Sequence, residues 1–292
     1  MIISHIIGGT GNQMFQYAVG RALALRLGTE VKVDVTEFAR YPLRTYDLHK
    51  FNVHTAKASA QEFLTLRGQI NQGPSSRLLQ RLLPRIYRTK TGYYKERGFT
   101  FDTNVLNLPD NTLLEGFWQS EKYFTDVADT IRQDFMTTEP LDPVNQHLYD
   151  QIKGTMAIAV HVRRGDYVTN SVTNAFHGTT PLEYYRAAVQ KMTAYVPQAT
   201  FFVFSDDHPW VQQNLKFNAP TVFVTANDAS RSHFDLHLMR ACQHHVLANS
   251  SFSWWGAWLA EHPTQHVIAP ARWFANISLD TKDLIPDRWE KM

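Results

Sequence analysis

Two adjacent arginines, Arg163 and Arg164, stand in a short run of charged residues that follows an apolar stretch. The stretch covers residues 156–160 and is typical of a buried strand, and residues 161–167 after it read His-Val-Arg-Arg-Gly-Asp-Tyr. Arginine presents a planar fork of donors that stays charged at any working pH, which suits a phosphate group. An ordinary strand end with a solvated Arg–Asp turn explains the pattern equally well, because surface ion pairs contribute only about 0–1 kcal/mol and are common.

Polar residues follow two later apolar stretches as well. Asp206 and Asp207 come after residues 200–204, and the run Asn-Ser-Ser-Phe-Ser at 249–253 comes after residues 246–248. Ligands of open parallel sheets bind at the carboxyl ends of the strands, so we expect these groups to meet the arginine pair at one edge. Such an edge suits a nucleotide diphosphate. Helix capping explains the two aspartates as well as a divalent metal does, and an Asp-x-Asp motif is absent.

A glycine-rich turn lies near the start of the chain. Residues 8–13 read Gly-Gly-Thr-Gly-Asn-Gln, between an apolar stretch at 1–7 and a segment with helical spacing of apolar residues. Gly9 and Gly11 let a ligand approach the backbone, and the helix start offers N–H groups. The turn lacks the Gly-x-Gly-x-x-Gly pattern of dinucleotide sites, so a turn needed only for packing is an equally good interpretation.

The elements that position these groups follow from the apolar spacing. Strands are predicted at 1–7, 31–35, 113–119, 156–162, 200–204, 221–224, 246–248 and 266–269, and helices at 59–67, 75–83, 121–135, 144–152, 181–195 and 232–243. Residues 163–178 are expected to form a loop, and Thr180 and Glu183 a capping box. Strands alternating with helices imply right-handed crossovers and parallel sheets. A break at residues 140–143 places a domain boundary there, between 1–143 and 144–292.

Composition excludes several classes of protein. A net charge of +2 in 292 residues leaves no basic footprint for nucleic acid, and the single cysteine, Cys242, excludes an internal disulfide. No apolar run approaches the roughly 18 residues of a membrane-spanning helix, and no signal peptide is evident. We therefore expect a cytoplasmic protein in which Cys242 is a buried, inert thiol. Trp118 is interpreted as a core residue or, less favourably, as a platform for a sugar ring.

Four motifs together resemble the bacterial α-1,2-fucosyltransferases of glycosyltransferase family 11. They are residues 8–18, 161–167, 204–207 and 248–258, and their order and spacing match over nearly the whole chain. The second and fourth motifs are highly specific in combination. One departure is Thr10, where the family usually has leucine, and this change affects the packing of the glycine turn without removing a charged group.

The resemblance implies an α/β fold of the GT-B-like kind. It has two Rossmann-type domains that face a cleft, with parallel sheets flanked by helices. Residues 1–143 would form the acceptor-side domain and residues 144–292 the GDP-sugar-binding domain. The implied donor is GDP-β-L-fucose, the implied acceptor is a terminal galactose of an oligosaccharide, and transfer would invert the anomeric carbon without a metal or another cofactor. Peripheral association with a membrane-linked glycan is compatible with this activity.

The resemblance also implies roles for individual residues. The His-x-Arg-Arg motif is similar to that of α-1,6- and protein O-fucosyltransferases, which makes Arg163 the diphosphate clamp and His161 the contact to the base. Ser251, Phe252 and Ser253 would give hydroxyl and backbone N–H groups to the phosphates, and Asp206 and Asp235 are candidates for orienting guanosine. Arg164 is a further candidate for binding the donor, as are Gly9, Gly11 and Asn12 of the glycine turn. From the position of the glycine turn, we also expect Asn12 and Gln13 to face the interdomain cleft and to orient donor or acceptor.

Two carboxylates are candidates for the general base. Asp166 follows the arginine pair in the same turn, and Glu121 lies in the first domain. A base must come within hydrogen-bond reach of the attacking hydroxyl. Asp166 has an alternative role, which is to fix Arg164 through an ion pair.

Two other functions remain open from the sequence. The first is transfer from another GDP- or UDP-sugar by the same architecture, and the second is non-catalytic glycan binding. A basic segment at 77–88 is interpreted as a solvated helix face or as a contact for an anionic acceptor.

Overall fold

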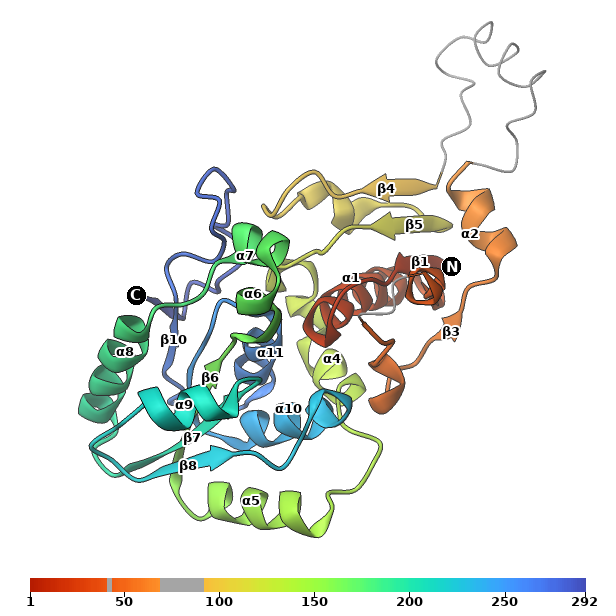
Figure 1. Ribbon diagram of the computed structural model, residues 1–292. Coiled ribbons are helices and arrows are strands. Elements are labelled where there is room, and N and C mark those ends of the chain that lie inside the picture. The colour runs from red at the N-terminus through yellow and green to blue at the C-terminus, as the bar shows by residue number, and fades with distance from the viewer. Residues whose placement is uncertain (41–43, 69–91) are drawn as a thin grey trace, which may run out of the picture. The chain divides into compact units, whose positions relative to one another are not determined.

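The computed structural model describes residues 1–40, 44–68 and 92–292 (Figure 1). The chain divides into two compact units, Met1–Phe135 and Met136–Met292. The predicted boundary follows residue 143, eight residues after this division. The helix predicted at 75–83 and the basic segment at 77–88 both lie outside the described residues.

The first unit is built around a parallel sheet. Its described strands pair in the order β3-β2-β1-β5-β4, and each pair is parallel. The strands are β1 (Ile2–His5), β2 (Val31–Asp34), β3 (Ala56–Lys57), β4 (Tyr93–Lys95) and β5 (Thr112–Glu115), and the α-helices are α1 (Thr10–Leu27), α2 (Ala60–Leu66) and α4 (Ala128–Asp134). Short 3-10 helices cover Thr36–Ala39, Leu48–Lys50, Thr103–Asn107, Glu121–Tyr123 and Thr125–Val127.

Helices cover both faces of this sheet. On the α1 side, a Cβ added to Gly20 would lie 2.1 Å from the Oγ of Ser4 in β1, so helix and strand are in close contact. On the α2 side, Phe63 packs against Ile3 of β1 and Leu113 of β5. Burial of a side chain of this size stabilises the fold by roughly 1.5–3 kcal/mol. The strand β1, which leads into the glycine turn, is therefore packed on both faces.

The second unit contains a larger parallel sheet. Its described strands pair in the order β11-β10-β9-β6-β7-β8. The strands are β6 (Met156–Val162), β7 (Ala199–Ser205), β8 (Thr221–Val224), β9 (His244–Val246), β10 (Val267–Ala269) and β11 (Glu290–Lys291). The α-helices are α5 (Pro143–Lys153), α6 (Gly165–Thr169), α7 (Ser171–His177), α8 (Leu182–Tyr195), α9 (His208–Asn214), α10 (Ser232–Ala241) and α11 (Ser251–Leu259), and Ala229–Arg231 form a 3-10 helix.

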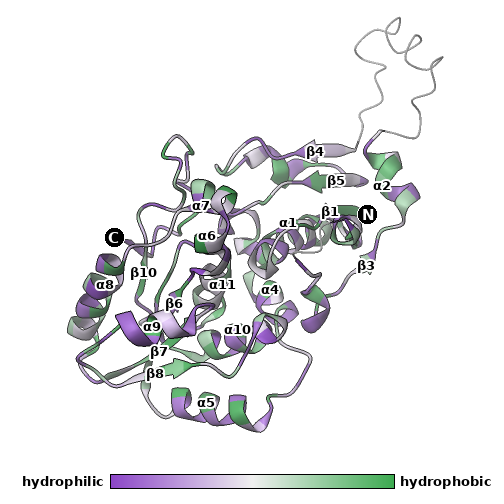
Figure 2. Cartoon of the chain, in the orientation of Figure 1, coloured by the Kyte–Doolittle hydropathy of each residue, from purple (hydrophilic) through white to green (hydrophobic). Residues whose placement is uncertain are grey.

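Different helices cover the two faces of the second sheet. Tyr185 of α8 and Val211 of α9 belong to one buried cluster with Ile158 and Phe201 of the sheet. On the other side α10 contacts both α5 and α11 (Figure 1). In Figure 2 the strand β8 is largely apolar, whereas α9 is largely polar. No helix in the described part of the chain combines the length and the apolarity needed to cross a membrane.

Two predicted elements next to the candidate site are wrong. The expected loop at 163–178 is instead the pair α6 and α7, and the side chain of Asn170 caps α7 by accepting the N–H groups of Val172 and Thr173, both at 3.0 Å. The expected capping box at Thr180 and Glu183 does not form, because α8 starts at Leu182 without a side-chain cap. The helices α6 and α7 have only five and seven residues, which is too short to show the repeating apolar spacing that identifies a longer helix.

Two further predictions fail around β5. The predicted strand 113–119 ends at Glu115, because the chain turns and Trp118 takes a left-handed φ of 57°. The predicted helix 121–135 is broken into two 3-10 turns and the short helix α4.

Candidate active site

The polar strand ends of the second unit lie at one edge of its sheet, as predicted. β6 lies between β7 and β9, and Val162 at the end of β6 is paired with Ser205 at the end of β7. The chain therefore leaves the sheet at neighbouring points into residues 163–167, 206–207 and 247–253. This carboxyl edge is where parallel α/β sheets bind ligands.

Arg163 is held between two carboxylates at this edge. Its Nη2 donates to Oδ1 of Asp166 at 2.5 Å, and its Nη1 lies 2.9 Å from Oδ2 of Asp206. The guanidinium carbon lies 5.4 Å from the ring centre of Tyr167. Burial disfavours the charged form, but Asp206 and Asp166 outweigh it, so the pKa of Arg163 is raised. The side chain is therefore a charged fork in a fixed orientation.

Arg164 points to a different element. Its Nε donates to Oδ2 of Asp207 at 3.0 Å, and its guanidinium carbon lies 4.0 Å from the ring centre of Trp210 in α9. This ion pair and cation–π contact tie the side chain to α9. The alternative in which Asp166 fixes Arg164 is wrong, because Asp166 pairs with Arg163. Whether Arg164 contacts the donor stays a prediction.

Asp206 connects the ends of β6 and β7. Its Oδ1 accepts the backbone N–H of Arg164 at 2.8 Å, while its Oδ2 contacts Arg163. A Cβ added to Gly165 would lie 2.3 Å from Oδ2 of Asp206, so glycine is required for this close approach. Asp207 accepts the N–H of Trp210 at 3.2 Å and caps α9, in agreement with the capping interpretation. Contact of Asp206 with guanosine stays a prediction.

His161 is a buried, neutral imidazole beside the arginine. It is 6% exposed, and its ring centre lies 5.7 Å from that of Phe252. Burial lowers its pKa to about 4, against the opposing effect of Asp206 and with the help of Arg163. Its Nδ1 is buried and has no hydrogen-bond partner among the described residues. A ligand at this edge can therefore satisfy one ring nitrogen of His161.

The helix α11 begins at the same edge. The side chain of Ser250 caps it by accepting the N–H of Phe252 at 3.3 Å. Ser253 is buried, and its hydroxyl lies 3.1 Å from the carbonyl oxygen of Ser250. Ser251 and Phe252 are only half-buried. The phosphate contacts predicted for this segment stay predictions, and Ser251 and Phe252 are more accessible for them than Ser253.

Asp235 lies in the first turn of α10, within a cluster of amides. Its Oδ1 accepts from Nδ2 of Asn227 at 2.8 Å, and Asn227 exchanges two hydrogen bonds with Asn145, at 3.0 and 2.8 Å. Burial raises the pKa of Asp235 to about 7, and the Asn227 bond and Arg231 oppose this shift. The guanosine contact predicted for Asp235 is untested.

The glycine turn of the first unit connects β1 to α1. Gly8 has a φ of 80°, which favours glycine, and Gly9 is the N-cap residue whose carbonyl oxygen accepts the N–H of Asn12 at 2.9 Å. Gly11 is buried in the first turn of α1. Thr10, which stands where the family usually has leucine, donates its hydroxyl group to Oδ2 of Asp47 at 2.8 Å. This bond connects the turn to the segment at 45–47.

Gln13 has a structural role. It is fully buried, its Nε2 donates to the carbonyl oxygens of Gly8 and Thr45 at 2.9 and 2.7 Å, and its Oε1 accepts the N–H of Asp47 at 2.8 Å. The expectation that Gln13 orients a substrate is therefore wrong. Asn12 is half-buried, and its Oδ1 accepts from Nε2 of Gln119 at 2.8 Å.

The segment after β5 is held by a carboxylate that the sequence did not single out. Oε2 and Oε1 of Glu96 accept the N–H groups of Phe117 and Trp118 at 2.6 and 2.9 Å. Burial raises the pKa of Glu96 to about 7, although both hydrogen bonds act to lower it. Trp118 is 1% exposed and packs against Tyr123, with ring centres 5.7 Å apart, which confirms the core interpretation.

The two candidate bases lie in different units. Glu121 is half-buried and starts a 3-10 turn of the first unit, where its carbonyl oxygen accepts the hydroxyl of Thr125 at 2.8 Å. Asp166 belongs to the second unit and is engaged with Arg163. The assignment of the base stays a prediction.

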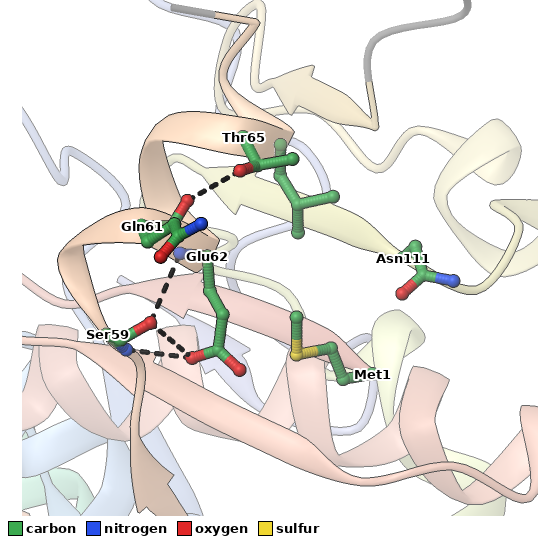
Figure 3. A pocket seen from close by; sticks show the side chains of 7 residues that line it. Met1, Ser59, Gln61, Glu62, Thr65 and Asn111 are labelled. Carbon is green, nitrogen blue, oxygen red and sulfur yellow. Dashed lines mark hydrogen bonds between the residues drawn. The ribbon is translucent and has the colours of Figure 1, made fainter. Parts of the chain in front are cut away.

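The first unit has a surface pocket beside α2 (Figure 3). It is lined by Met1, Ser59, Gln61, Glu62, Thr65, Leu66 and Asn111. Met1 and Asn111 directly precede β1 and β5, so the pocket lies at the amino edge of the sheet, opposite the glycine turn. Ser59 and Glu62 bind each other in a capping box. Position and mutual hydrogen bonding both favour a structural role for this surface.

The comparison with known families decides the classification. The family model described as "Glycosyl transferase family 11" matches residues 71–289. The chain belongs to glycosyl transferase family 11. This family 11 protein is 29% identical to an Escherichia coli protein named alpha-1,2-colitosyltransferase, with 100% of this chain and 99% of the relative covered. It is also 29% identical to the Escherichia coli O-antigen biosynthesis glycosyltransferase WbnK, with 93% and 94% covered.

Similar solved structures agree with the fold. NodZ alpha-1,6-fucosyltransferase co-crystallized with GDP has a TM-score of 0.50 at 15% identity, covering 87% of this chain and 90% of that chain. An Arabidopsis thaliana FUT1 mutant in complex with GDP has a TM-score of 0.51 at 10% identity, covering 91% and 69%. At these identities the likeness concerns the fold alone. The predicted fold class, a GT-B-like pair of α/β domains with parallel sheets flanked by helices, is confirmed.

Proposed function

We propose that this family 11 glycosyltransferase moves L-fucose from GDP-β-L-fucose to O2 of a terminal galactose, with inversion and without a metal ion. Family membership supports the fucosyltransferase-like activity. The observation that carries the proposal is Arg163, a charged fork fixed by two aspartates at the carboxyl edge of the second sheet. The acceptor is a galactose-terminated oligosaccharide, and the O-antigen relative favours a repeat unit of a surface polysaccharide, with peripheral binding where that unit is membrane-linked.

The reaction is a single displacement. The galactose O2 forms a bond to the anomeric carbon while the bond from that carbon to the diphosphate oxygen breaks, and the hydroxyl proton passes to a carboxylate. Negative charge grows on the departing GDP. Arg163 and the N-terminus of α11, both at the carboxyl edge of the second sheet, are proposed to stabilise that charge, and the neutral His161 is proposed to contact the guanine base through a ring nitrogen. Asp166 and Glu121 are the proposed alternatives for the proton acceptor.

A second donor is favoured by one specific observation. The relative that matches over 100% of this chain is named a colitosyltransferase. Colitose is L-fucose without the 3-hydroxyl group, so GDP-colitose presents the same diphosphate to Arg163. The two donors differ only at a sugar hydroxyl, and specificity of this kind resides in hydrogen bonds to that hydroxyl.

The test is GDP release from GDP-fucose and from GDP-colitose, with and without lactose, in a chelator-treated sample. Lactose-dependent release from GDP-fucose, with an α-1,2-linked product, supports the main proposal. Faster release from GDP-colitose supports the second donor, and a requirement for added divalent ion refutes the metal-free mechanism. As a second measurement, GDP should raise the melting temperature more than UDP, because a ligand bound only by the native state stabilises it. An equal shift would contradict guanosine selectivity.

A further inference from the structure

Gln119 is a buried polar residue in the first unit with one unused atom. It is 7% exposed, and its Nε2 donates to Oδ1 of Asn12 at 2.8 Å. Its Oε1 is buried, and no described residue offers it a hydrogen bond. A buried polar atom without a partner costs about 1–3 kcal/mol, so native proteins rarely keep one without a reason. The atom is therefore a candidate for contact with a ligand.

The pair lies at the carboxyl edge of the first sheet. Asn12 is in the first turn of α1, which follows β1, and Gln119 lies four residues beyond β5. β1 and β5 are neighbours in the sheet. The two amides therefore occupy the edge at which a parallel α/β sheet accepts ligands.

The backbone before Gln119 is held in an unfavourable conformation. Trp118 has a φ of 57°, which is uncommon for a bulky residue. Glu96 accepts the N–H of Trp118, and Gln16 donates to the carbonyl oxygen of Gly116 at 3.0 Å. A Cβ added to Gly116 would lie 2.4 Å from the Cβ of Glu96, so the turn is closely packed. Strain that several contacts maintain is typical of functional sites.

We propose that Gln119, paired with Asn12, binds a hydroxyl group of the acceptor galactose and selects for it. This inference rests on the proposed function. The residues proposed to bind the diphosphate lie in the second unit, so we assign the edge of the first sheet to the other substrate. A hydroxyl suits the pair because it donates to an amide oxygen and accepts from an amide NH₂, whichever way the two amides are oriented. The hydroxyl is one that does not react, so Gln119 is a specificity residue.

The experiment removes the residue and the substrate hydroxyls in combination. Wild-type protein and the Gln119→Met variant are assayed with a galactoside and with its 3-deoxy, 4-deoxy and 6-deoxy analogues, using the same donor. We expect one deoxy analogue to lower kcat/KM of the wild type by about 10- to 100-fold, as for loss of a partner to a buried polar group. The Gln119→Met variant should discriminate against that analogue by less than about threefold, since the partner of the hydroxyl is gone.

Controls separate this role from folding. The Gln119→Glu variant keeps an accepting oxygen and should retain most of the discrimination, whereas Gln133→Met changes an exposed glutamine of the same unit and should behave as wild type. Melting curves with and without GDP show that each variant is folded and still binds nucleotide.

Several outcomes would overturn the inference. Equal discrimination by wild type and Gln119→Met for every acceptor analogue refutes acceptor recognition. If the wild type itself releases no GDP from either donor in the presence of galactosides, the proposed function has failed, and the inference falls with it. If the wild type transfers the sugar, but the effects of the Gln119→Met substitution and of each acceptor deoxygenation on kcat/KM are additive, the inference is refuted and the proposed function stands.

Discussion

Replacement of Arg163 by lysine, compared with the same replacement at Arg164, tests how the second unit stabilises the leaving group. The two arginines are adjacent and keep their charge in both variants. Arg163 faces Asp166 and Asp206 at the carboxyl edge, whereas Arg164 lies against Trp210 of α9. The pair therefore provides its own matched control.

The magnitudes follow from these contacts. In Arg163 two different nitrogens engage two carboxylates, at 2.5 and 2.9 Å, and this fixes the plane of the fork. The single nitrogen of lysine cannot hold both positions. Loss of one preorganised donor to a developing charge costs about 10²–10³ in kcat, or about 2.7–4 kcal/mol of transition-state stabilisation. Arg164→Lys loses planar stacking on Trp210, which is worth about 0.5–2 kcal/mol, and this loss should appear mainly as reduced stability.

The assay measures kcat and KM for GDP-fucose with saturating lactose, together with thermal unfolding of each variant. We expect Arg163→Lys to lower kcat by about 10²–10³ when it is assayed well below its own melting temperature, where the variant is folded. Arg164→Lys should lower kcat by less than about tenfold and lower the melting temperature by a few degrees. Near-wild-type turnover by Arg163→Lys, or a larger loss of kcat in Arg164→Lys, would refute the assignment of Arg163 as the clamp.

Three further predictions concern the neighbourhood of the site and the effect of pH. Gly165→Ala should lower kcat/KM by about 10- to 100-fold, because the added Cβ displaces Asp206. Gly98→Ala is the control and should leave kcat/KM unchanged, because its Cβ would meet no atom within 4 Å. Equal kcat/KM of the two variants would contradict this role of Asp206. In pH–rate profiles, Asp166→Asn or Glu121→Gln should abolish the acidic limb of kcat/KM, and the variant that does so identifies the base; a limb retained in both excludes both. Burial lowers the pKa of His245 from 6.5 to about 4, so the unfolded chain binds more protons between these values and the unfolding free energy should fall by up to roughly 3 kcal/mol as pH drops through them. Urea unfolding should show a weaker pH dependence in His245→Gln, and an unchanged dependence would contradict this origin.

The sequence was informative wherever chemistry coincided with a strand end. The apolar stretch before Arg163 and the polar residues that follow β7 and β9 placed these groups at one edge, because strand order in a parallel sheet brings carboxyl ends together. The partner of Asp166 could not be predicted in the same way. Asp166 is near both Arg163 and Arg164 in sequence, and only the packing of Arg164 on Trp210 decides which arginine remains for it.

The segment after β5 shows why other parts were not predictable. Residues 113–119 are mostly apolar and aromatic, as strands often are, yet the chain turns at Trp118, whose N–H is accepted by Glu96, 22 positions earlier. No local pattern reports a contact of that separation. Gln13 and Asn12 illustrate the same limit, because these neighbours in one motif have different environments. Gln13 is buried and bonded to Gly8, Thr45 and Asp47, whereas Asn12 is half-buried and bonded to Gln119.

The charges at the arginine pair constrain how the proposed donor diphosphate would bind there. Two arginines, Arg163 and Arg164, face the three aspartates Asp166, Asp206 and Asp207, so this cluster has a net charge of −1. Net charge alone would repel GDP. In the proposed function, affinity would therefore come from directed donors, namely the fork of Arg163 and the N-terminus of α11, rather than from a diffuse positive field. Binding that depends on directed donors should respond weakly to salt, because short contacts in a partly buried site are screened less than exposed charges are.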